Sequence, residues 1–123
     1  MSGLESRLLG RWGEERVADY LRTRGWDLLA AGWRCRFGEI DLIAEDRDYI
    51  AFVEVKLRKD ARFAPARSAV DGGKRERLRT AAALYLAQNP SPRQPRFDVA
   101  EVYAPQGTRT PKPEIYYIED AFE

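Results

Sequence analysis

Carboxylates and a lysine interrupt two neighbouring segments that otherwise have the composition of buried β-strands. Residues 38–45 contain Asp41, and residues 49–58 contain Glu54 and Lys56. Side chains alternate between the two faces of a strand, so Glu54 and Lys56 share one face. A charge buried in a strand is costly unless it pairs or binds a metal ion. The pattern therefore predicts a functional site where Asp41, Glu54 and Lys56 meet at one rim of a sheet.

Metal-assisted hydrolysis of a phosphodiester is the chemistry that fits these residue types. The carboxylates of Asp41 and Glu54, with the carbonyl oxygen of Val55, would give a divalent cation oxygen ligands. Such an ion polarises the phosphodiester and lowers the pKa of a bound water, while Lys56 orients that water or stabilises the phosphate charge. The sequence has no His, which excludes His-dependent nucleophiles and favours oxygen-bound Mg²⁺ or Mn²⁺ over Zn²⁺.

A carboxylate on a helix is expected to join this set. Apolar residues recur near the helical period over residues 4–24, which predicts an amphipathic helix. Glu14 falls on the buried stripe of this helix with Val17 and Leu21, whereas Glu15 falls on the solvent face. Glu14 would hold a metal-bound water or a second ion. A salt bridge from Glu14 to a nearby arginine is the structural alternative.

The carboxylates of the first strand also have structural interpretations. Asp41 could pair with Lys56 across the strands, although such a pair contributes little net stability. Glu39 shares the face of Asp41 and Ile43 if the strand alternates regularly. Glu39 could instead cap the turn at Gly38 or form a salt bridge with Arg36, so we treat it as a secondary candidate.

Further elements follow from periodicity and turn residues, and they complete one domain over residues 1–123. The expected segments are an extended stretch at 26–37, strands at 38–45 and 49–58, a loop at 59–71, a helix at 73–88, a strand at 96–103, a loop at 104–113 and a short strand at 115–118. The resulting order, αβββαββ, predicts an α/β fold with a central mixed β-sheet flanked by helices. Asp98 is expected to be structural.

Positive charge is concentrated directly after the acidic strands, although the net charge is only +1. Residues 54–80 contain nine Lys or Arg residues and four acidic residues, whereas residues 97–123 contain two basic and six acidic residues. A basic segment beside a metal site suits a polyanion, so we expect a nucleic-acid partner whose backbone contacts Arg58, Lys74 and Arg75. A solvated loop and helix face is the alternative interpretation.

The sequence carries no pattern of membrane insertion or export. No apolar run is long enough to span a membrane, and the first residues lack a signal-peptide pattern. We therefore expect a cytoplasmic protein without a membrane partner. Cys35 is the single cysteine and is expected to be a buried structural thiol, because no partner base is near it.

Asp41 followed by Glu54-Val55-Lys56, with a helix glutamate upstream, resembles the PD-(D/E)XK nuclease superfamily, in which the Pro-Asp half of the motif is often reduced to Asp. Nearly the whole chain is similar to the YraN-like family of small bacterial proteins. The matching stretches are Gly13-Glu14 with Tyr20-Leu21, residues 33–43 (Trp-Arg-Cys-Arg-Phe-Gly-Glu-Ile-Asp-Leu-Ile), residues 52–56 (Phe-Val-Glu-Val-Lys), Lys74-Arg75 and residues 96–99 (Arg-Phe-Asp-Val).

This resemblance implies a restriction-endonuclease-like fold similar to that of archaeal Holliday-junction resolvases. It also implies a Mg²⁺- or Mn²⁺-dependent endonuclease that hydrolyses phosphodiester bonds in DNA, with branched DNA or repair intermediates as substrates. Asp41, Glu54, Lys56 and Glu14 would be the catalytic residues, and Asp41, Glu54, Val55 and Glu14 the metal ligands. Because two cuts need two sites, resolution of a junction implies a homodimer.

Two other classes of function are also compatible with the sequence. The first is a nucleic-acid-binding module without hydrolysis, which needs the basic segment but not the acids. The second is a protein-interaction subunit that dimerises through an edge strand, with exposed aromatic rings at Tyr103, Tyr116 and Tyr117.

Overall fold

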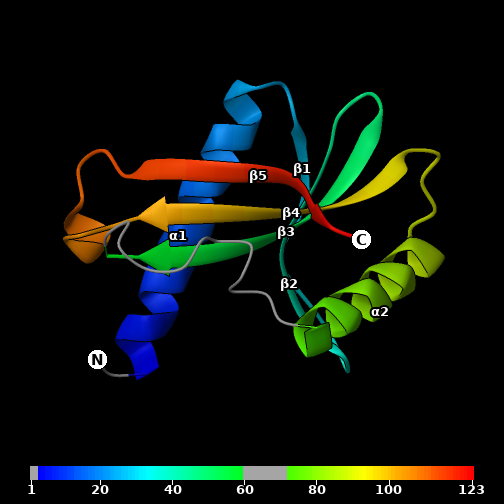
Figure 1. Ribbon diagram of the computed structural model, residues 1–123, viewed down its shortest axis with the longest axis horizontal. Helices are drawn as coiled ribbons and strands as arrows, with labels where there is room; N and C mark the ends of the chain where they lie inside the picture. The colour runs from blue at the N-terminus through cyan, green and yellow to red at the C-terminus, as the bar shows by residue number, and fades with distance from the viewer. Residues whose placement is uncertain (1–2, 60–71) are drawn as a thin grey trace.

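The computed structural model describes residues 3–59 and 72–123 (Figure 1). Its elements are α1 (Gly3–Thr23), β1 (Asp27–Cys35), β2 (Gly38–Glu45), β3 (Tyr49–Arg58), α2 (Gly72–Gln88), β4 (Gln94–Tyr103), the 3₁₀ helix η2 (Gly107–Arg109) and β5 (Glu114–Phe122). The predicted loop at 59–71 and part of the basic segment lie outside the described residues. Within the described ranges, no helix is both long enough and apolar enough to cross a membrane.

One sheet of five strands holds the fold together, in the order β1-β2-β3-β4-β5. β3 and β4 run parallel, whereas the other neighbouring pairs are antiparallel. A parallel pair needs a crossover connection, and α2 lies within it. The architecture confirms the predicted α/β fold with a mixed sheet and the element order αβββαββ.

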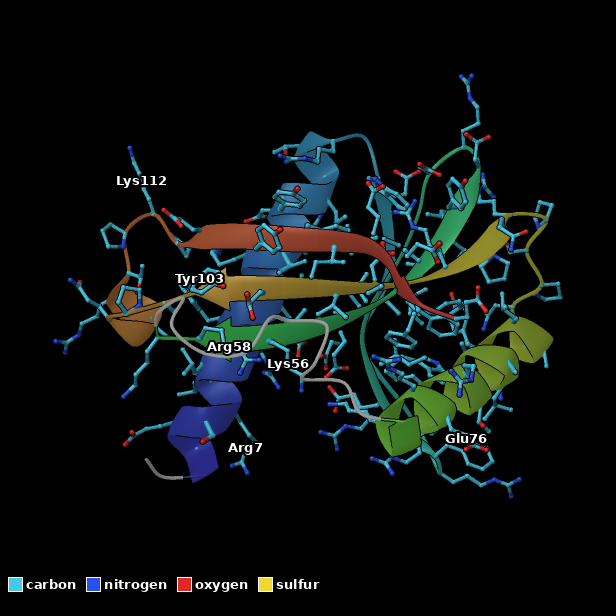
Figure 2. The ribbon with its side chains drawn as sticks, in the orientation of Figure 1. Arg7, Lys56, Arg58, Glu76, Tyr103 and Lys112 are labelled. Atoms are coloured by element: carbon cyan, nitrogen blue, oxygen red, sulfur yellow. The ribbon has the colours of Figure 1, made fainter. Side chains whose placement is uncertain are left out.

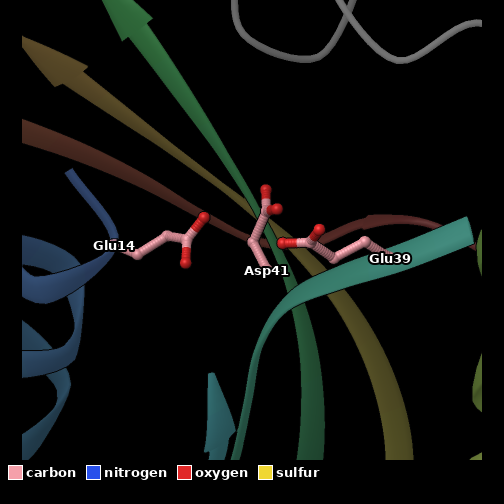
Figure 3. A group of neighbouring side chains, drawn as sticks. All are labelled: Glu14, Glu39 and Asp41. Carbon is pink, nitrogen blue, oxygen red and sulfur yellow. The ribbon is translucent and has the colours of Figure 1, made fainter. Parts of the chain in front are cut away.

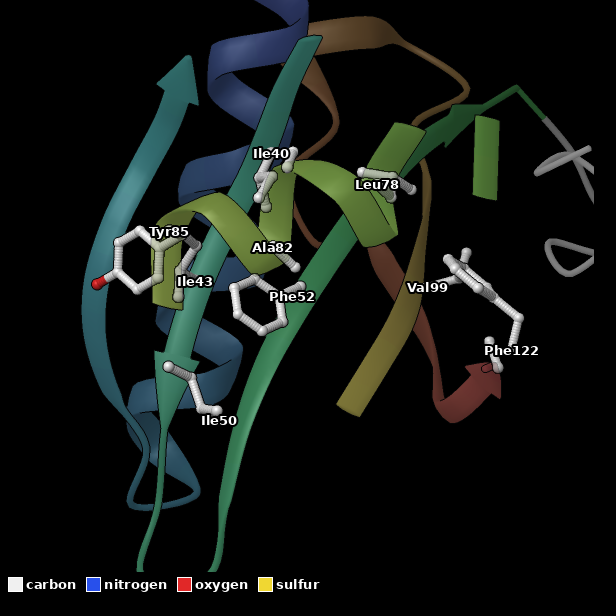
Figure 4. Packing of buried hydrophobic residues seen from close by; sticks show 11 residues of the cluster. Ile40, Ile43, Ile50, Phe52, Leu78, Ala82, Tyr85, Val99 and Phe122 are labelled. Atoms are coloured by element: carbon white, nitrogen blue, oxygen red, sulfur yellow. The ribbon is translucent and has the colours of Figure 1, made fainter. Parts of the chain in front are cut away.

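The helices α1 and α2 cover opposite faces of the sheet, so the central strands are buried on both sides. On β3, Ile50 and Phe52 pack in the cluster beneath α2 (Figure 4), whereas Ala51 and Val53 pack in the cluster beneath α1. Successive side chains of a strand point to opposite faces, which explains this division. The charged end of β3 therefore lies between two helices.

Helix α1 approaches β3 closely at Gly13. Gly13 is buried, and a Cβ atom at this position would lie 3.0 Å from Cδ2 of Leu57 on β3. The lack of a side chain lets the helix pack directly against the strand. Val17 and Leu21, on the same helical face, are fully buried. This packing fixes the rotation of the helix and places the next residue, Glu14, beside the sheet.

Strand β5 is longer than the short strand predicted at 115–118, because it continues to Phe122. The register between β4 and β5 shifts between Phe97 and Val99, and Asp120 adopts a positive φ of 51°. Between these two pairs β4 has one residue and β5 has three, so this bulge adds two residues to β5 without ending the pairing. Phe122 then stacks on Phe97, with ring centroids 5.2 Å apart.

Asp98 on β4 is a buried acceptor that ties this bulge to the sheet. Its carboxylate accepts hydrogen bonds from the Arg96 side chain at 2.9 and 3.0 Å, from the Tyr117 hydroxyl at 2.6 Å and from the Asp120 N–H at 2.8 Å. The side chain is 0% exposed. Burial of a carboxylate is tolerated where donors surround it in this way. Asp98 therefore has a structural role.

The tyrosines expected at an edge-strand interface differ in their contacts. The Tyr103 hydroxyl donates to Glu101, and the Tyr117 hydroxyl donates to Asp98. Tyr116 is 63% exposed on β5, an edge strand of the sheet. Of the three, Tyr116 presents most of its ring to solvent.

Replacement of Asp98 by Ala should destabilise the fold by about 3 kcal/mol, because it leaves the Arg96 guanidinium and the Tyr117 hydroxyl buried without their acceptor. Glu119→Ala is the matched control, since Glu119 is exposed and lies 4.0 Å from Arg96. We expect the control to change stability by less than about 0.5 kcal/mol. Urea unfolding of both variants measures this, and equal stabilities would contradict the assignment.

Candidate active site

The site arises because β2 and β3 separate at Asp41. The two strands pair up to Leu42↔Val53, and the same register would next place Asp41 opposite Glu54 and then Ile40 opposite Val55. Instead, β2 stays paired with β1, and β3 stays paired with β4 (Figure 1). The sheet therefore forks, and polar side chains enter the opening between its two branches.

The bend that produces the fork lies at Gly32 on β1. Gly32 has a φ of 63°, which L side chains rarely adopt, and the register of β1 with β2 places it opposite Asp41. On β2, Ile40 and Ile43 pack in the same cluster although they are three residues apart. The regular alternation expected for Glu39, Asp41 and Ile43 is therefore not kept through the bend.

Where the strands separate, the Asp41 carboxylate replaces the backbone acceptor that an N–H group of β3 would have had on β2. Its Oδ2 accepts from the N–H of Val55 at 2.8 Å. In an antiparallel ladder the N–H and C=O of one residue leave the strand at the same edge. The carbonyl of Val55, predicted as a metal ligand, therefore faces the same opening as the Asp41 carboxylate.

Three carboxylates from α1 and β2 meet at this opening. One oxygen each of Glu14, Glu39 and Asp41 lies within 4.8 Å of the others (Figure 3). Figure 3 shows Glu14 reaching in from the helix and Glu39 from the strand, with Asp41 between them. Arg34 on β1 binds Glu39, with Nε 3.1 Å from Oε2. We call Glu14, Glu39 and Asp41 the acidic cluster.

Burial and the repulsion of neighbouring carboxylates make Glu14 and Asp41 hard to ionise. Burial raises the pKa of Asp41 to about 7, with a further contribution from the negative charge of Glu54. Burial also raises the pKa of Glu14 to about 7, with help from the charge of Glu39. Such shifts are typical of sites that are built to receive a cation or a proton.

Glu54 lies next to the acidic cluster but is bound by two lysines. Its Oε1 is 2.5 Å from Nζ of Lys74 on α2 and 3.3 Å from Nζ of Lys56 on β3. The residue is 4% exposed. Burial lowers the pKa of Lys56, and the neighbouring Lys74 lowers it further. Lys56 therefore pairs with Glu54, rather than with Asp41 as the structural alternative proposed.

A cavity of about 260 Å³ makes this part of the site accessible. It lies between the end of β2 and α2, and its charged lining residues are Glu39, Asp41, Glu54, Lys74 and Arg77. Carboxylates and cationic side chains thus border one space. A phosphate group in that space would meet Glu39 and Asp41 on one side and Lys74 and Arg77 on the other.

The remaining predicted contact residues are engaged within the fold. Arg58 binds the buried carboxylate of Glu101 on β4, with Nε 3.0 Å from Oε2. Figure 2 shows Arg58 near Lys56 on β3, with Tyr103 at the end of β4. The guanidinium of Arg75 lies 5.3 Å from the centre of the Phe122 ring. Of the three predicted nucleic-acid contacts, Lys74 is the one that borders the site.

Sequence reasoning ranked Glu39 below the other acids and did not single out Arg77. The Glu-x-Asp spacing of Glu39 and Asp41 on one strand is the signal that would have raised Glu39. Arg77 lies three residues after Lys74, so the helical period places both on one side of α2. Glu39 and Arg77 therefore line the same site as the predicted residues Asp41, Glu54 and Lys74.

Asp41→Asn should stabilise the protein at high pH when no divalent cation is present. The pKa of Asp41 is raised above its ordinary value of 3.8, so the folded state holds a proton that the unfolded state releases between about pH 4 and 7. Stability therefore falls as the pH rises through this window. Asparagine keeps an acceptor for Val55 but removes the charge.

We expect the melting temperature of Asp41→Asn in chelator at pH 8 to exceed that of the wild type by about 2–6 °C, and the difference to shrink at pH 5. Glu15→Gln, at the exposed neighbour of Glu14, is the control. A lower melting temperature for Asp41→Asn at pH 8 would contradict the assigned repulsion.

Comparisons with known proteins place the chain in a family. The model of the family described as "Uncharacterised protein family UPF0102" matches residues 13–102. A UPF0102 protein of Nocardia farcinica is 43% identical over 119 residues, which cover 96% of this chain and 91% of the relative. A UPF0102 protein of Syntrophomonas wolfei is 41% identical, covering 95% and 99%, and one of Pseudomonas putida is 39% identical, covering 93% and 92%. The matched residues span the fork and its carboxylates, and the chain belongs to family UPF0102, the YraN-like family.

Proposed function

We propose that this protein is a metal-dependent endonuclease of the PD-(D/E)XK type that hydrolyses phosphodiester bonds in DNA, with branched DNA or repair intermediates as substrates. One observation carries the proposal. The fork between β2 and β3 places Asp41 and Glu54 at an open cavity, with Lys56 bound to Glu54 and Glu14 beside Asp41. These are the residue types that hydrolysis of a phosphodiester by a divalent cation and an ammonium group requires.

The residues of the opening fit a divalent cation. The acidic cluster offers oxygen donors within 4.8 Å of one another, and its members repel each other when ionised. A cation would relieve that repulsion, and oxygen ligands suit Mg²⁺ or Mn²⁺. Glu14, Glu39 and Asp41 would hold the ion, with Glu54 and the Val55 carbonyl at the same opening. When bound, the ion supplies Lewis-acid polarisation of the phosphodiester and a lowered pKa of water.

Lys56 and Lys74 supply the positive charge of the site. Both ammonium groups are held by one oxygen of Glu54, which fixes their positions relative to Asp41. The side chain of Lys56 is 23% exposed, and its lowered pKa eases the donation of a proton or hydrogen bond to a phosphate oxygen. Lys74 enters from the other side of the cavity and stabilises the same charge.

A second candidate is a nucleic-acid-binding module without hydrolysis. The observation that favours it is that Glu54 is paired with Lys56 and Lys74 and not turned toward the acidic cluster. In that case the cavity would recognise a phosphate without cleaving it. Measurements of cleavage and of metal binding separate the two candidates.

Cleavage of labelled duplex, single-stranded, flap and four-way-junction DNA should require Mg²⁺ or Mn²⁺ and should fall about 100-fold or more in Glu54→Gln and in Lys56→Met. Each variant removes one charge and keeps most of the side-chain volume. Glu15→Gln, which lies next to Glu14 but is exposed, should cleave as the wild type does. A wild type that binds these DNAs and cuts none would favour the binding module.

Millimolar Mn²⁺ should raise the melting temperature of the wild-type protein, because an ion that binds only the folded state stabilises it by RT ln(1 + [L]/Kd). Asp41→Asn should lose most of this shift, because it removes one of the three carboxylates of the acidic cluster. Differential scanning fluorimetry with and without Mn²⁺ measures the shift. An unchanged shift in Asp41→Asn would place the ion elsewhere.

A further inference from the structure

A second, larger hollow opens on the other side of the acidic cluster. It is a groove of about 790 Å³ between α1 and the β1–β2 pair. Glu14 and Glu39 line it, and Glu39 also lines the cavity of about 260 Å³ beside α2. The two hollows therefore meet at Glu39, near the start of β2. A chain molecule bound in one would continue past the acidic cluster into the other.

Arginines dominate the cationic lining of this groove. They are Arg7, Arg11, Arg16 and Arg22 of α1 and Arg34 of β1. Arg7, Arg11 and Arg22 share one face of the helix, because spacings of four residues and of about four turns return to the same side, whereas Arg16 lies on another face. Figure 2 shows Arg7 on the N-terminal part of α1. The row runs along the helix toward and past Glu14.

Several of these guanidinium groups keep donors available. Arg34 binds Glu39 through Nε, yet its side chain is 80% exposed, so its amino groups remain accessible. Arg7 and Arg11 are exposed and one helical turn apart. Within the described part of the chain, Nε of Arg16 is a buried donor without a hydrogen-bond partner, although Arg16 pairs with Asp19 through Nη2 at 3.4 Å. An anionic oxygen would satisfy this donor.

The dimensions of the groove suit one strand of nucleic acid. From Arg7 to Arg22 the helix axis advances about 22 Å, so a volume of about 790 Å³ gives a mean cross-section of about 36 Å². An extended sugar–phosphate backbone fits such a channel. A duplex, whose major groove alone is about 12 Å wide and about 8.5 Å deep, has a cross-section several times larger and would place only one strand in the groove. Among the described residues that line the groove none is aromatic, so contacts to phosphates rather than stacking on bases are expected.

We infer that the groove between α1 and β1 binds the backbone of a single DNA strand that flanks the bond to be cut. This inference rests on the proposed function and deepens it. Arg7 and Arg11 bind phosphates of that strand. The strand passes Glu39 and reaches the cavity bordered by Lys74 and Arg77. The preferred substrate is therefore DNA with a single-stranded arm, bound without regard to base sequence.

The test is the affinity of the full chain for labelled single-stranded, flap and fully paired DNA, measured in chelator by fluorescence anisotropy over a range of salt concentrations. The test variant is Arg7→Ala combined with Arg11→Ala. The matched control is Arg47→Ala combined with Lys112→Ala, which removes the same charge from exposed positions outside the groove. Circular dichroism verifies that each variant folds.

We expect the test variant to bind single-stranded and flap DNA about tenfold more weakly. The slope of log K against log[salt] should become shallower by about 1.4, which is about 0.7 for each of two lost phosphate contacts. The control should bind within about twofold of the wild type, with its slope unchanged. Equal losses in both variants, or an equal loss on fully paired DNA, would overturn the inference, as would tighter binding of the matching RNA strand.

The outcome is separable from that of the proposed function, because binding is measured without a divalent cation. A wild type that binds through the arginines but never cleaves DNA would refute the nuclease and retain the groove. Cleavage by the wild type with unaltered binding by the test variant would retain the nuclease and refute the groove.

Discussion

The hydrogen bond from the Val55 N–H to the Asp41 carboxylate is the contact on which the site depends. Where β2 leaves β3, a backbone donor of a central strand loses its partner, and a buried donor without an acceptor is costly. Asp41 satisfies that donor from the departing strand. The same contact holds the Asp41 carboxylate beside Glu14, Glu39 and Glu54. The hydrogen bond that satisfies the backbone therefore brings like charges close together.

The charges of these carboxylates are balanced differently on the two sides of the sheet. On the side of α2, Glu54 is neutralised by Lys56 and Lys74. On the side of α1, Glu14 and Glu39 face each other across Asp41, and the pKa of Glu14 rises to about 7. Two lysines thus neutralise Glu54 on the side of α2, whereas on the side of α1 Arg34 is the arginine bound to one of the three carboxylates among the described residues. The asymmetry suits a site that acquires part of its charge from solution.

Local patterns in the sequence were enough to predict the elements that carry the chemistry. The alternation of residues and the short polar turn between them predicted strands at 38–45 and 49–58, which match β2 and β3. The helical phase separated Glu14, which reaches the acidic cluster, from the exposed Glu15. These predictions succeed because period-two and period-3.6 patterns report directly on which face is buried.

Such patterns could not predict contacts between segments that are distant in the sequence. The pairing of Arg58 with Glu101 depends on the parallel register of β3 and β4, which a crossover helix separates in sequence. The extension of β5 depends on a bulge at Asp120 that a buried Asp98 supports. Glu39 was ranked second because a salt bridge to an arginine could explain it, and the structure shows that it both binds Arg34 and lies in the acidic cluster.

The separation of β2 from β3 also divides β1 and β2 into a part that is continuous with the other strands and an arm in which these two strands pair only with each other. In the described structure, the arm consists of residues 38–41 of β2 and their partners on β1, and these residues of β2 do not pair with β3. Equal insertions in both strands of the arm would lengthen it without shifting the register of the core. The arm carries Arg34 and Glu39, so its length would set how far the protein reaches along a bound molecule. The length of the arm could thus change while the register of the other strands stays the same.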